Sequence, residues 1–286
     1  MEGTARIDIQ RGAAAILPEV LSTAGELEVR LARGPEDVQA AQRLRYRVFY
    51  EEMAAEPTPQ MAAARRDFDA FDEICDILLV VDPGRRDGDC VVGTYRLLRQ
   101  DVAMRHGGFY SASEYDLGPL LTQLSDKRRG LELGRSCVHP AYRTTATIQL
   151  LWRGIASYLA AHRIAFMFGC ASLPGTDARA LAPQLSFIRR HFLAPELLRV
   201  RALPDRYVSM DIAQQDELGE RRAMKTLPPL VKGYLRLGCY VGDGAVIDRQ
   251  FGTTDIFIIL PVERIRERYF NHFGKPEAID RTVGLA

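Results

Sequence analysis

Residues 131–170 read LELGRSCVHPAYRTTATIQLLWRGIASYLAAHRIAFMFGC, and their pattern decides the fold class. Leu131–Val138 and Ile164–Cys170 have the composition of strands, and the second run is almost entirely apolar. The apolar residues between them follow the i, i+3, i+4, i+7, i+11 spacing of an amphipathic helix: Ile148, Leu151, Trp152, Ile155 and Leu159. The segment therefore predicts a strand, a helix and a second strand, and the second strand is expected in the centre of a sheet.

Further strands and helices are expected on both sides of this segment. Strands are predicted at Leu27–Ala32, Asp76–Val81, Cys90–Leu98, Tyr207–Ile212 and Asp255–Leu260, and helices at Pro35–Met53, Asp177–Phe192 and Val262–Phe273. The turn-rich sequence DPGRRDGD joins two of these strands into a hairpin, and Ala54–Arg66, with two prolines, is expected to be a loop. The mixed order of elements predicts an α+β sheet with helices on both faces.

Composition excludes several classes of protein. The 286 residues are 47 % apolar and 26 % charged, as in an ordinary globular protein, and the net charge of +1 argues against general nucleic-acid binding. The apolar runs are too short to cross a bilayer, and the N-terminus lacks the apolar segment of a secretory signal. Five scattered cysteines without a C-x-x-C pair indicate a reduced, cytoplasmic protein without zinc or a disulfide framework.

The chain shows no internal repeat and no low-complexity linker, so we expect one main domain. Residues 1–25 are expected to be an N-terminal arm, and residues 276–286 a tail. The domain between them, residues 26–275, is divided into a core over about 26–213 and a C-terminal extension over about 214–275.

Common catalytic motifs are absent. The sequence contains no G-x-x-x-x-G-K-[ST], H-E-x-x-H or G-x-S-x-G, and no G-x-G-x-x-G follows a predicted strand. The five histidines lack the spacing of metal ligands, so no metal site is predicted. Phosphoryl transfer, zinc-dependent hydrolysis and nicotinamide redox chemistry therefore have no positive signal.

Charged residues interrupt apolar patterns in four fragments. These are RYRVF at 45–49, DFDAFD at 67–72, VGTYRL at 92–97 and ELGR at 132–135. Charges in buried strands are costly unless they are paired. One interpretation is a structural salt-bridge network, and the other is an active site that holds a zwitterionic substrate.

In chain order, the patterns R-x-x-x-F, D-x-x-D, V-G-T-x-R-L and E-x-x-R resemble the acyl-homoserine-lactone autoinducer synthases, which have the GNAT fold. The segments CASLPGT at 170–176, PPLVKGY at 228–234 and FGTTD at 251–255 resemble the ornithine N-acyltransferases of ornithine-lipid synthesis. This resemblance covers residues 27–275. It implies a GNAT fold with a central mixed, mostly antiparallel sheet, helices on both faces and a C-terminal extension. The implied reaction transfers a 3-hydroxyacyl group from acyl carrier protein to the α-amine of L-ornithine, giving lyso-ornithine lipid.

The resemblance also implies a set of site residues. Catalytic roles fall to Glu132 and Arg135, and substrate-binding roles to Arg45, Phe49, Asp69, Asp72 and Arg96. A carboxylate in a partly dry site suits removal of a proton from the substrate amine, so Glu132 is the expected base, directly or through a water. Arg96 or Arg135 would hold the substrate carboxylate, and Asp69 or Asp72 the side-chain ammonium. Cys137 as a nucleophile is disfavoured because no base stands beside it.

The donor side differs from coenzyme A-dependent GNAT enzymes. Those enzymes share a Q/R-x-x-G-x-G/A loop that binds the pyrophosphate of coenzyme A. The corresponding segment here, Arg143–Ile148, contains no glycine. Glycine lets the backbone approach a phosphate closely, so a pyrophosphate is disfavoured. Acyl carrier protein presents one phosphate, for which we expect a site formed by Val138, Arg143, Thr144 and Thr145. No cofactor is expected to be resident. The alternative to phosphate binding is that Thr144 or Thr145 only caps the following helix.

A basic, apolar segment at Phe187–Arg206 is the expected docking surface for the acidic carrier protein. Its arginines Arg189, Arg190, Arg199 and Arg201 would make the contacts, or would lie on anionic lipid at the inner membrane face. A solvated helix face is the alternative. For the whole chain, the rival functions are an autoinducer synthase and a non-catalytic GNAT-like domain that binds lipid or a partner.

The spacing of Glu132 and Arg135 makes a geometric prediction. Side chains alternate between the faces of a strand, so residues three apart point in opposite directions. If both serve one site, a β-bulge must intervene, and Gly134 is the residue best able to adopt the unusual dihedrals. We therefore expect a disrupted ladder at Gly134 or Arg135.

Overall fold

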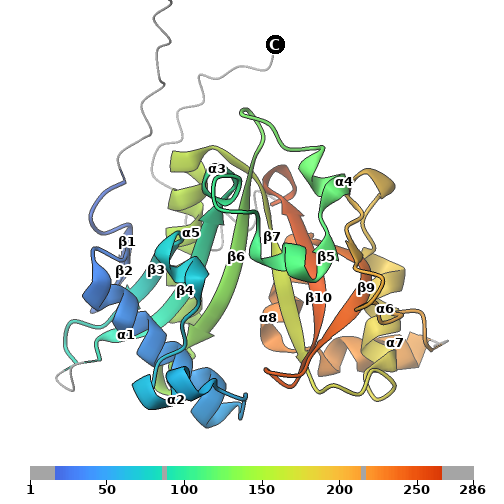
Figure 1. Cartoon of the computed structure of the whole chain (residues 1–286), viewed down its shortest axis with the longest axis horizontal. Coiled ribbons are helices and arrows are strands. Elements are labelled where there is room, and N and C mark those ends of the chain that lie inside the picture. The colour runs from blue at the N-terminus through green and yellow to red at the C-terminus, as the bar shows by residue number, and fades with distance from the viewer. Residues whose placement is uncertain (1–16, 86–88, 214–216, 266–286) are drawn as a thin grey trace, which may run out of the picture.

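The computed structural model describes residues 17–85, 89–213 and 217–265, and in this part of the chain ten strands form one sheet. The strand order is β1-β2-β3-β4-β6-β7-β10-β9-β8-β5. The bounds are β1 Ser22–Ala24, β2 Leu27–Leu31, β3 Asp76–Val81, β4 Val91–Arg99, β5 Tyr115–Asp116, β6 Arg129–Val138, β7 Ile164–Pro174, β8 Arg201–Ala202, β9 Tyr240–Asp248 and β10 Thr253–Pro261. Pairing is antiparallel except between β6 and β7 and between β8 and β9. The predicted α+β fold, with a mixed and mostly antiparallel sheet, is confirmed (Figure 1).

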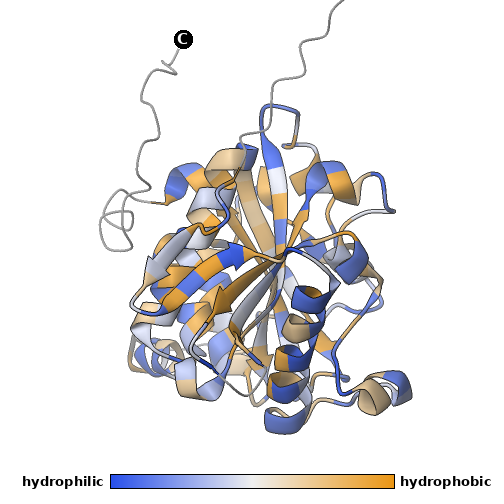
Figure 2. Ribbon diagram, turned by 90° about the vertical axis from the view of Figure 1, so that its left-hand side faces the viewer, coloured by the Kyte–Doolittle hydropathy of each residue, from blue (hydrophilic) through white to orange (hydrophobic). Residues whose placement is uncertain are grey.

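Helices cover both faces of this sheet. The bounds are α1 Pro35–Tyr46, α2 Pro59–Ala64, α3 Gln100–Ala103, α4 Gly118–Leu121, α5 Thr145–His162, α6 Ala182–Phe192, α7 Glu217–Thr226 and α8 Pro229–Leu237. A π-helical turn, η1 (Arg47–Glu52), prolongs α1, and short 3₁₀ turns follow at η2 (Ala70–Glu73), η3 (Tyr110–Ser113), η4 (Pro140–Tyr142), η5 (Glu196–Leu198) and η6 (Val262–Arg264). Figure 2 shows orange and blue alternating along the helices, as expected for helices with one face on a sheet.

The alternation of β3 separates two cores. Leu78 and Val80 pack in one cluster with Leu151 of α5, whereas Ile77 and Leu79 pack in another with Leu44 of α1. Helices α1 and α5 therefore cover opposite faces, called here the α1 face and the α5 face. The strand–helix–strand segment β6-α5-β7 and the central position of β7 agree with the sequence analysis.

Several expected elements differ. The expected loop at 54–66 contains α2, whose N-cap Thr58 accepts a hydrogen bond from the amide of Met61. The expected strand Tyr207–Ile212 is wrong, because Val208 makes an isolated bridge to Ala245 and no ladder. Strand β9 was not anticipated. It lies with β10 inside the sheet, although both strands belong to the segment expected to be a C-terminal extension.

The ends of the chain are described in part. Residues Ser22–Ala24, within the expected N-terminal arm, form β1 and pair with β2. Of the expected helix Val262–Phe273, residues 262–264 form η6, and the remainder from 266 lies outside the described residues, as does the tail. Among the residues described, no helix is both long and apolar enough to cross a membrane.

Candidate active site

A β-bulge in β6 brings two charged side chains to one face. Opposite β4, Gly134 pairs with Arg96 and Cys137 pairs with Thr94, so two residues of β6 face Tyr95 alone. Arg135 adopts a left-handed conformation with φ of 50°. The predicted bulge is confirmed, although Arg135 and not Gly134 takes the unusual dihedrals. As a result, Arg135 contacts Tyr110, whose backbone amide also binds Glu132.

Beside the bulge, β6 and β7 part. Their parallel pairing ends at Glu132 opposite Phe168, and β7 continues without a partner on this side. Gly169 follows with φ of 154°, and a Cβ there would lie 2.3 Å from the carbonyl oxygen of Leu133. Only glycine permits this backbone approach, so Gly169 fixes the point where the strands diverge.

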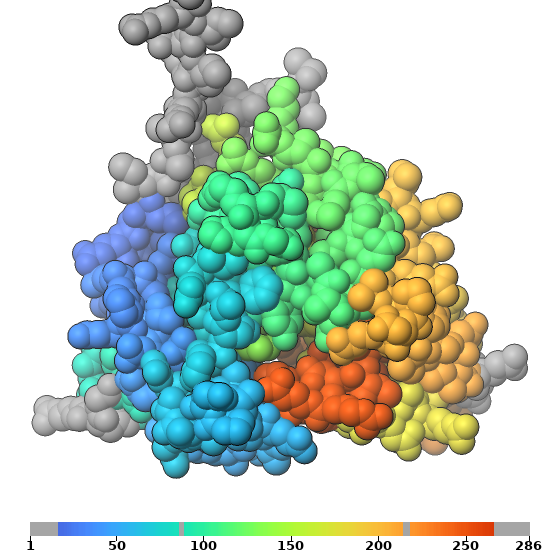
Figure 3. Space-filling model, viewed as in Figure 1, coloured from blue at the N-terminus to red at the C-terminus, as the bar shows by residue number. Residues whose placement is uncertain are grey.

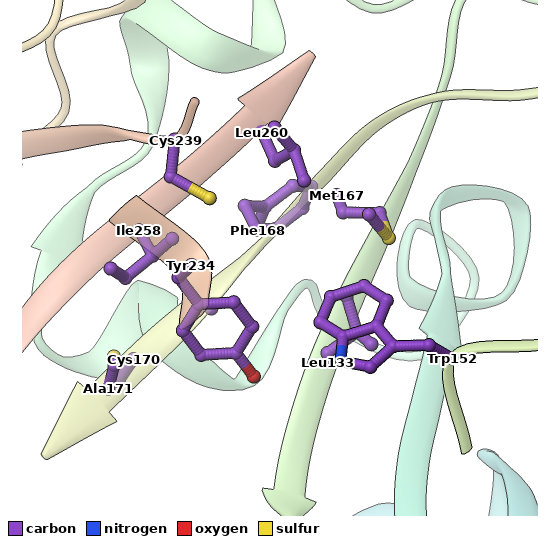
Figure 4. A pocket seen from close by; sticks show the side chains of 11 residues that line it. Leu133, Trp152, Met167, Phe168, Cys170, Ala171, Tyr234, Cys239, Ile258 and Leu260 are labelled. Atoms are coloured by element: carbon purple, nitrogen blue, oxygen red, sulfur yellow. The ribbon is translucent and has the colours of Figure 1, made fainter. Parts of the chain in front are cut away.

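An apolar pocket lies at this divergence (Figure 4). Strands β6, β7 and β10, together with α5 and α8, supply its walls. The lining residues are Leu133, Trp152, Met167, Phe168, Gly169, Cys170, Ala171, Tyr234, Cys239, Ile258 and Leu260. Tyr234 belongs to the PPLVKGY segment, and its hydroxyl lies 3.1 Å from that of Tyr95. The apolar walls suit part of an acyl chain.

On the α1 face, three arginines and three aspartates form one network. Arg45, only 1 % exposed, pairs with Asp67 at 2.7 Å and with Asp72 at 2.5 Å. Arg96 contacts Asp69 at 2.6 Å and Asp72 at 3.4 Å, and Arg135 contacts Asp67 at 3.3 Å and Asp69 at 3.2 Å. Each charge is thus shared between two opposite charges, which offsets the cost of burial.

The network contains a closed part and an open part. Burial alone would raise the pKa of Asp72, but the hydrogen bonds and charge of Arg45 outweigh it and hold that pKa below its ordinary value. The side chains of Asp69 and Arg135 are 24 % and 14 % exposed, more than the others in the network. Arg45 and Asp72 therefore support the fold, whereas Asp69 and Arg135 can reach a substrate.

Glu132 is buried beneath η3. Its carboxylate accepts hydrogen bonds from the amides of Tyr110 at 2.7 Å and Ser111 at 2.9 Å. Burial raises the pKa of Glu132 above its ordinary value, against the lowering effect of the Ser111 and Tyr110 hydrogen bonds. Each carboxylate oxygen retains a further lone pair, so the group can still accept a proton. Cys137 is a poor nucleophile here because burial raises the pKa of its thiol to about 12.

The residues expected around the donor meet at the start of α5. Thr144 is the N-cap and accepts a hydrogen bond from the amide of Thr147, so the capping role is confirmed. Arg143 donates to the Val138 carbonyl at 3.1 Å and forms a two-fold ion pair with Glu52. Thr145 is exposed in the first turn.

Most of the expected docking arginines have acidic partners within the chain. Arg189 pairs with Asp243 at 2.9 Å, and Arg190 pairs with Glu220 at 2.6 Å. Arg201, 64 % exposed, lies 3.8 Å from Asp243, and Arg199 donates to the carbonyl of Ala194. These contacts reduce the net positive charge of the surface.

Three residues in contact with the network were not among the site residues expected from the sequence. Asp67 lies in the quoted DFDAFD fragment, and its burial between Arg45 and Arg135 makes it central to the network. Tyr110 carries no charge, and its ring lies under the guanidinium groups of Arg96 and Arg135. Phe251, in the quoted FGTTD segment, packs on Arg135 and against Phe49.

The fold and the site define a GNAT-type acyltransferase: residues 44–153 match the acetyltransferase (GNAT) domain family. The chain is 47 % identical to an L-ornithine N(alpha)-acyltransferase of Rhizobium meliloti, over 95 % of this chain and 92 % of the relative. It is 50 % identical to the enzyme of that name from Brucella abortus, over 89 % of this chain and 91 % of the relative. This chain belongs to the L-ornithine N(alpha)-acyltransferase family.

Among solved structures, the chain is similar to an N-acyl amino acid synthase from uncultured soil microbes. The two share 11 % identity with a TM-score of 0.49, over 86 % of this chain and 98 % of the other.

Proposed function

We propose that this enzyme transfers a 3-hydroxyacyl group from acyl carrier protein to the α-amine of L-ornithine. The product would be lyso-ornithine lipid, formed in the first step of ornithine-lipid biosynthesis. The observation that carries the proposal is the identity of 43–50 % to four enzymes named L-ornithine N(alpha)-acyltransferase. The apolar pocket and the charged network support it, because the reaction joins an acyl chain to a zwitterion.

The pocket supplies polar groups for a hydroxylated chain. Among the described residues, the indole N–H of Trp152 has no hydrogen-bond partner, and its ring lies 6.1 Å from that of Tyr234. The Tyr234 hydroxyl can exchange its bond to Tyr95 for one to a ligand. A 3-hydroxyl on the acyl chain would therefore find a donor and an acceptor in walls that are otherwise apolar.

The amino acid would bind on the α1 face. Arg135 receives the substrate carboxylate, and Glu132 takes a proton from the α-ammonium through one water. The freed amine attacks the thioester carbonyl, whose oxygen is stabilised by backbone amides near Val138. The C–S bond then breaks, and the pantetheine thiol leaves with a proton.

The donor would be carrier protein and not free coenzyme A. The glycine-free start of α5, at Thr144 and Thr145, offers hydroxyls and amides to one phosphate, with no loop shaped for a pyrophosphate. The exposed arginines of the docking segment face an acidic carrier protein, and anionic lipid at the inner membrane face is a second contact for a lipid-forming enzyme. Its location would be cytoplasmic.

The test is an acyl-transfer assay with two donors and single amino acids. Purified enzyme is mixed with 3-hydroxyacyl carrier protein or the matching coenzyme A ester, and products are identified by mass spectrometry. We expect N-acylornithine, with a far higher kcat/KM for the carrier protein. Equal kcat/KM values would refute the donor assignment, a lactone from a methionine-derived substrate would support an autoinducer synthase, and no transfer to any amino acid would support a binding domain.

A further inference from the structure

Two buried carboxylates next to the site have no part in the mechanism above. Glu114 follows η3 and is 6 % exposed, and Asp255 lies in β10 and is 7 % exposed. Cys170 of β7 connects them: its thiol donates to Glu114 at 3.4 Å, and its strand pairs with β10. Both carboxylates therefore lie on the α1 face, beyond the point where β6 and β7 part.

These carboxylates have too little compensating charge. Glu114 contacts Arg206 at 3.3 Å, and Arg206 is itself 35 % exposed. Asp255 accepts hydrogen bonds from the hydroxyls of Thr253, at 2.8 Å, and Ser172, and no basic side chain among the described residues lies within ion-pair distance of it. Burial raises the pKa of Asp255 to about 6, and the charge of Glu114 adds to this effect. Burial of a carboxylate is costly, and the described part of the chain offers Asp255 no basic partner. This arrangement suggests that the cation arrives with a ligand.

A metal ion does not fit this position. Within the described residues, no group of three or more histidine, cysteine, aspartate or glutamate side chains is arranged to hold one. Two carboxylates and neighbouring hydroxyls suit an ammonium group, which needs a few acceptors and no fixed coordination geometry.

Contacts and charge connect the two carboxylates with Arg135. The centre of the Phe251 ring lies 5.0 Å from the guanidinium carbon of Arg135. Asp255 follows Phe251 by four residues in the chain. Arg135 is also near enough to Glu114 to lower its pKa, although burial keeps that pKa above its ordinary value. Figure 3 shows this face of the molecule hollowed where the cyan, green and red segments meet. These colours mark the parts of the chain around residues 70, 110 and 250.

We propose that Glu114 and Asp255 bind the side-chain ammonium of the acceptor amino acid while Arg135 binds its carboxylate. The inference rests on the proposed function and deepens it. It replaces Asp69 and Asp72 in the role expected from the sequence, because three arginines already neutralise those aspartates. The enzyme would thus select a diamino acid by a pair of acids on one side of the recess and an arginine on the other.

The test compares ornithine with norvaline, which has the same carbon skeleton but no terminal amine. kcat/KM is measured for both acceptors with the wild type, Glu114→Gln, Asp255→Asn and the control Asp126→Asn, a matched change on an exposed turn. We expect the wild type to favour ornithine by about 100-fold, as loss of a charged hydrogen-bonded contact implies. Asp255→Asn and Glu114→Gln should each lower kcat/KM for ornithine about 10-fold or more and leave that for norvaline unchanged.

A second variant covers the case in which the buried substitutions fail to fold. Ser172 is exposed and lies opposite Asp255 in the β7–β10 ladder. Ser172→Lys places a tethered ammonium beside Asp255, and it should remove the preference for ornithine without lowering norvaline turnover. An unchanged ornithine preference in folded Asp255→Asn or in Ser172→Lys would overturn the inference. Failure of the wild type to acylate ornithine at all would instead contradict the proposed function.

Discussion

At the scale of single residues, the charged fragments divide into an enclosed group and a partly exposed group. Arg45 and Asp72 are enclosed and neutralise each other, which is the structural interpretation. Asp69 and Arg135 keep exposed surface beside the Tyr110 ring, where Arg135 can meet a substrate carboxylate. The sequence showed that the charges belong together but not which of them face solvent, because exposure depends on packing by Phe251 and Tyr110 from distant segments.

The division predicts unequal effects on stability. Asp72→Ala leaves the buried Arg45 without its main partner and should lower the free energy of unfolding by about 3–5 kcal/mol. Asp69→Ala should cost about 1 kcal/mol, because its carboxylate is partly solvated and its arginines retain other partners. Urea unfolding at pH 7 measures both, and equal losses would contradict the division.

Asp255 predicts a dependence of stability on pH. Its pKa is about 6 in the folded state against an ordinary 3.8, so folding favours the protonated form. The contribution of protonated Asp255 to the free energy of unfolding is fully present below about pH 4 and is lost as the pH rises through 6. At pH 8, Asp255→Asn should therefore be more stable than the wild type by up to about 3 kcal/mol, and at pH 4 about equal. Melting temperatures of both proteins between pH 4 and 8 test this, and parallel curves would contradict it.

At the scale of elements, the bulge and the divergence of β6 from β7 build the site. Gly169 and Gly134 lie close to each other on these strands but differ in what a side chain would meet. A Cβ at Gly169 would clash with the Leu133 carbonyl, whereas at Gly134 the nearest atom is the Arg96 Nε at 4.0 Å.

Alanine at the two glycines should therefore have different effects. Gly169→Ala should destabilise the protein by several kcal/mol and reduce acyl transfer, because the strands must shift. Gly134→Ala should cost less than about 1 kcal/mol and keep activity. Urea unfolding with the transfer assay makes the comparison; a tolerated Gly169→Ala would show that the divergence does not depend on this glycine.

The sequence predicted these elements unevenly. The resemblance placed Glu132 and Arg135 in one site, and their spacing then predicted the bulge, because they can share a face only if the strand slips. It did not show that Arg135 would adopt φ of 50°, a choice stabilised by Asp67, Asp69 and two aromatic rings. The prediction of a strand at Tyr207–Ile212 was wrong, because the segment has the composition of a strand but forms no ladder with a neighbour. The short helix α2 was predicted as a loop because the segment contains two prolines.

At the scale of the whole molecule, the sheet separates the two proposed substrate sites. The acyl pocket lies against α5 and α8, and the charged recess lies on the α1 face, so the two substrates would meet through the gap between β6 and β7. The docking segment lies at the far edge of the sheet, near β8 and β9 (Figure 1). No local sequence pattern shows which distant segments meet in the folded chain. The position of Glu114 was therefore not predicted from the sequence.

Charge reversal tests the docking segment. The double change Arg199→Glu with Arg201→Glu should raise KM for acyl carrier protein about 10-fold, spare kcat and leave KM for ornithine unchanged. The reason is that it weakens donor binding equally in the ground state and the transition state. Arg189 and Arg190 are poorer choices because their ion pairs within the chain, at 2.9 Å with Asp243 and 2.6 Å with Glu220, are closer than the 3.8 Å contact of Arg201 with Asp243. Lys127→Glu, on an exposed turn, is the matched control. An unchanged donor KM would exclude this surface.

The most direct measurement locates the acyl group in the product. The enzyme is given 3-hydroxyacyl carrier protein and ornithine labelled with ¹⁵N at the α-amine, and the product is fragmented by tandem mass spectrometry. The account predicts an amide on the labelled α-nitrogen and a free side-chain amine, because Arg135 and the Glu114–Asp255 pair hold the two ends of the substrate. An amide on the side-chain nitrogen would contradict it.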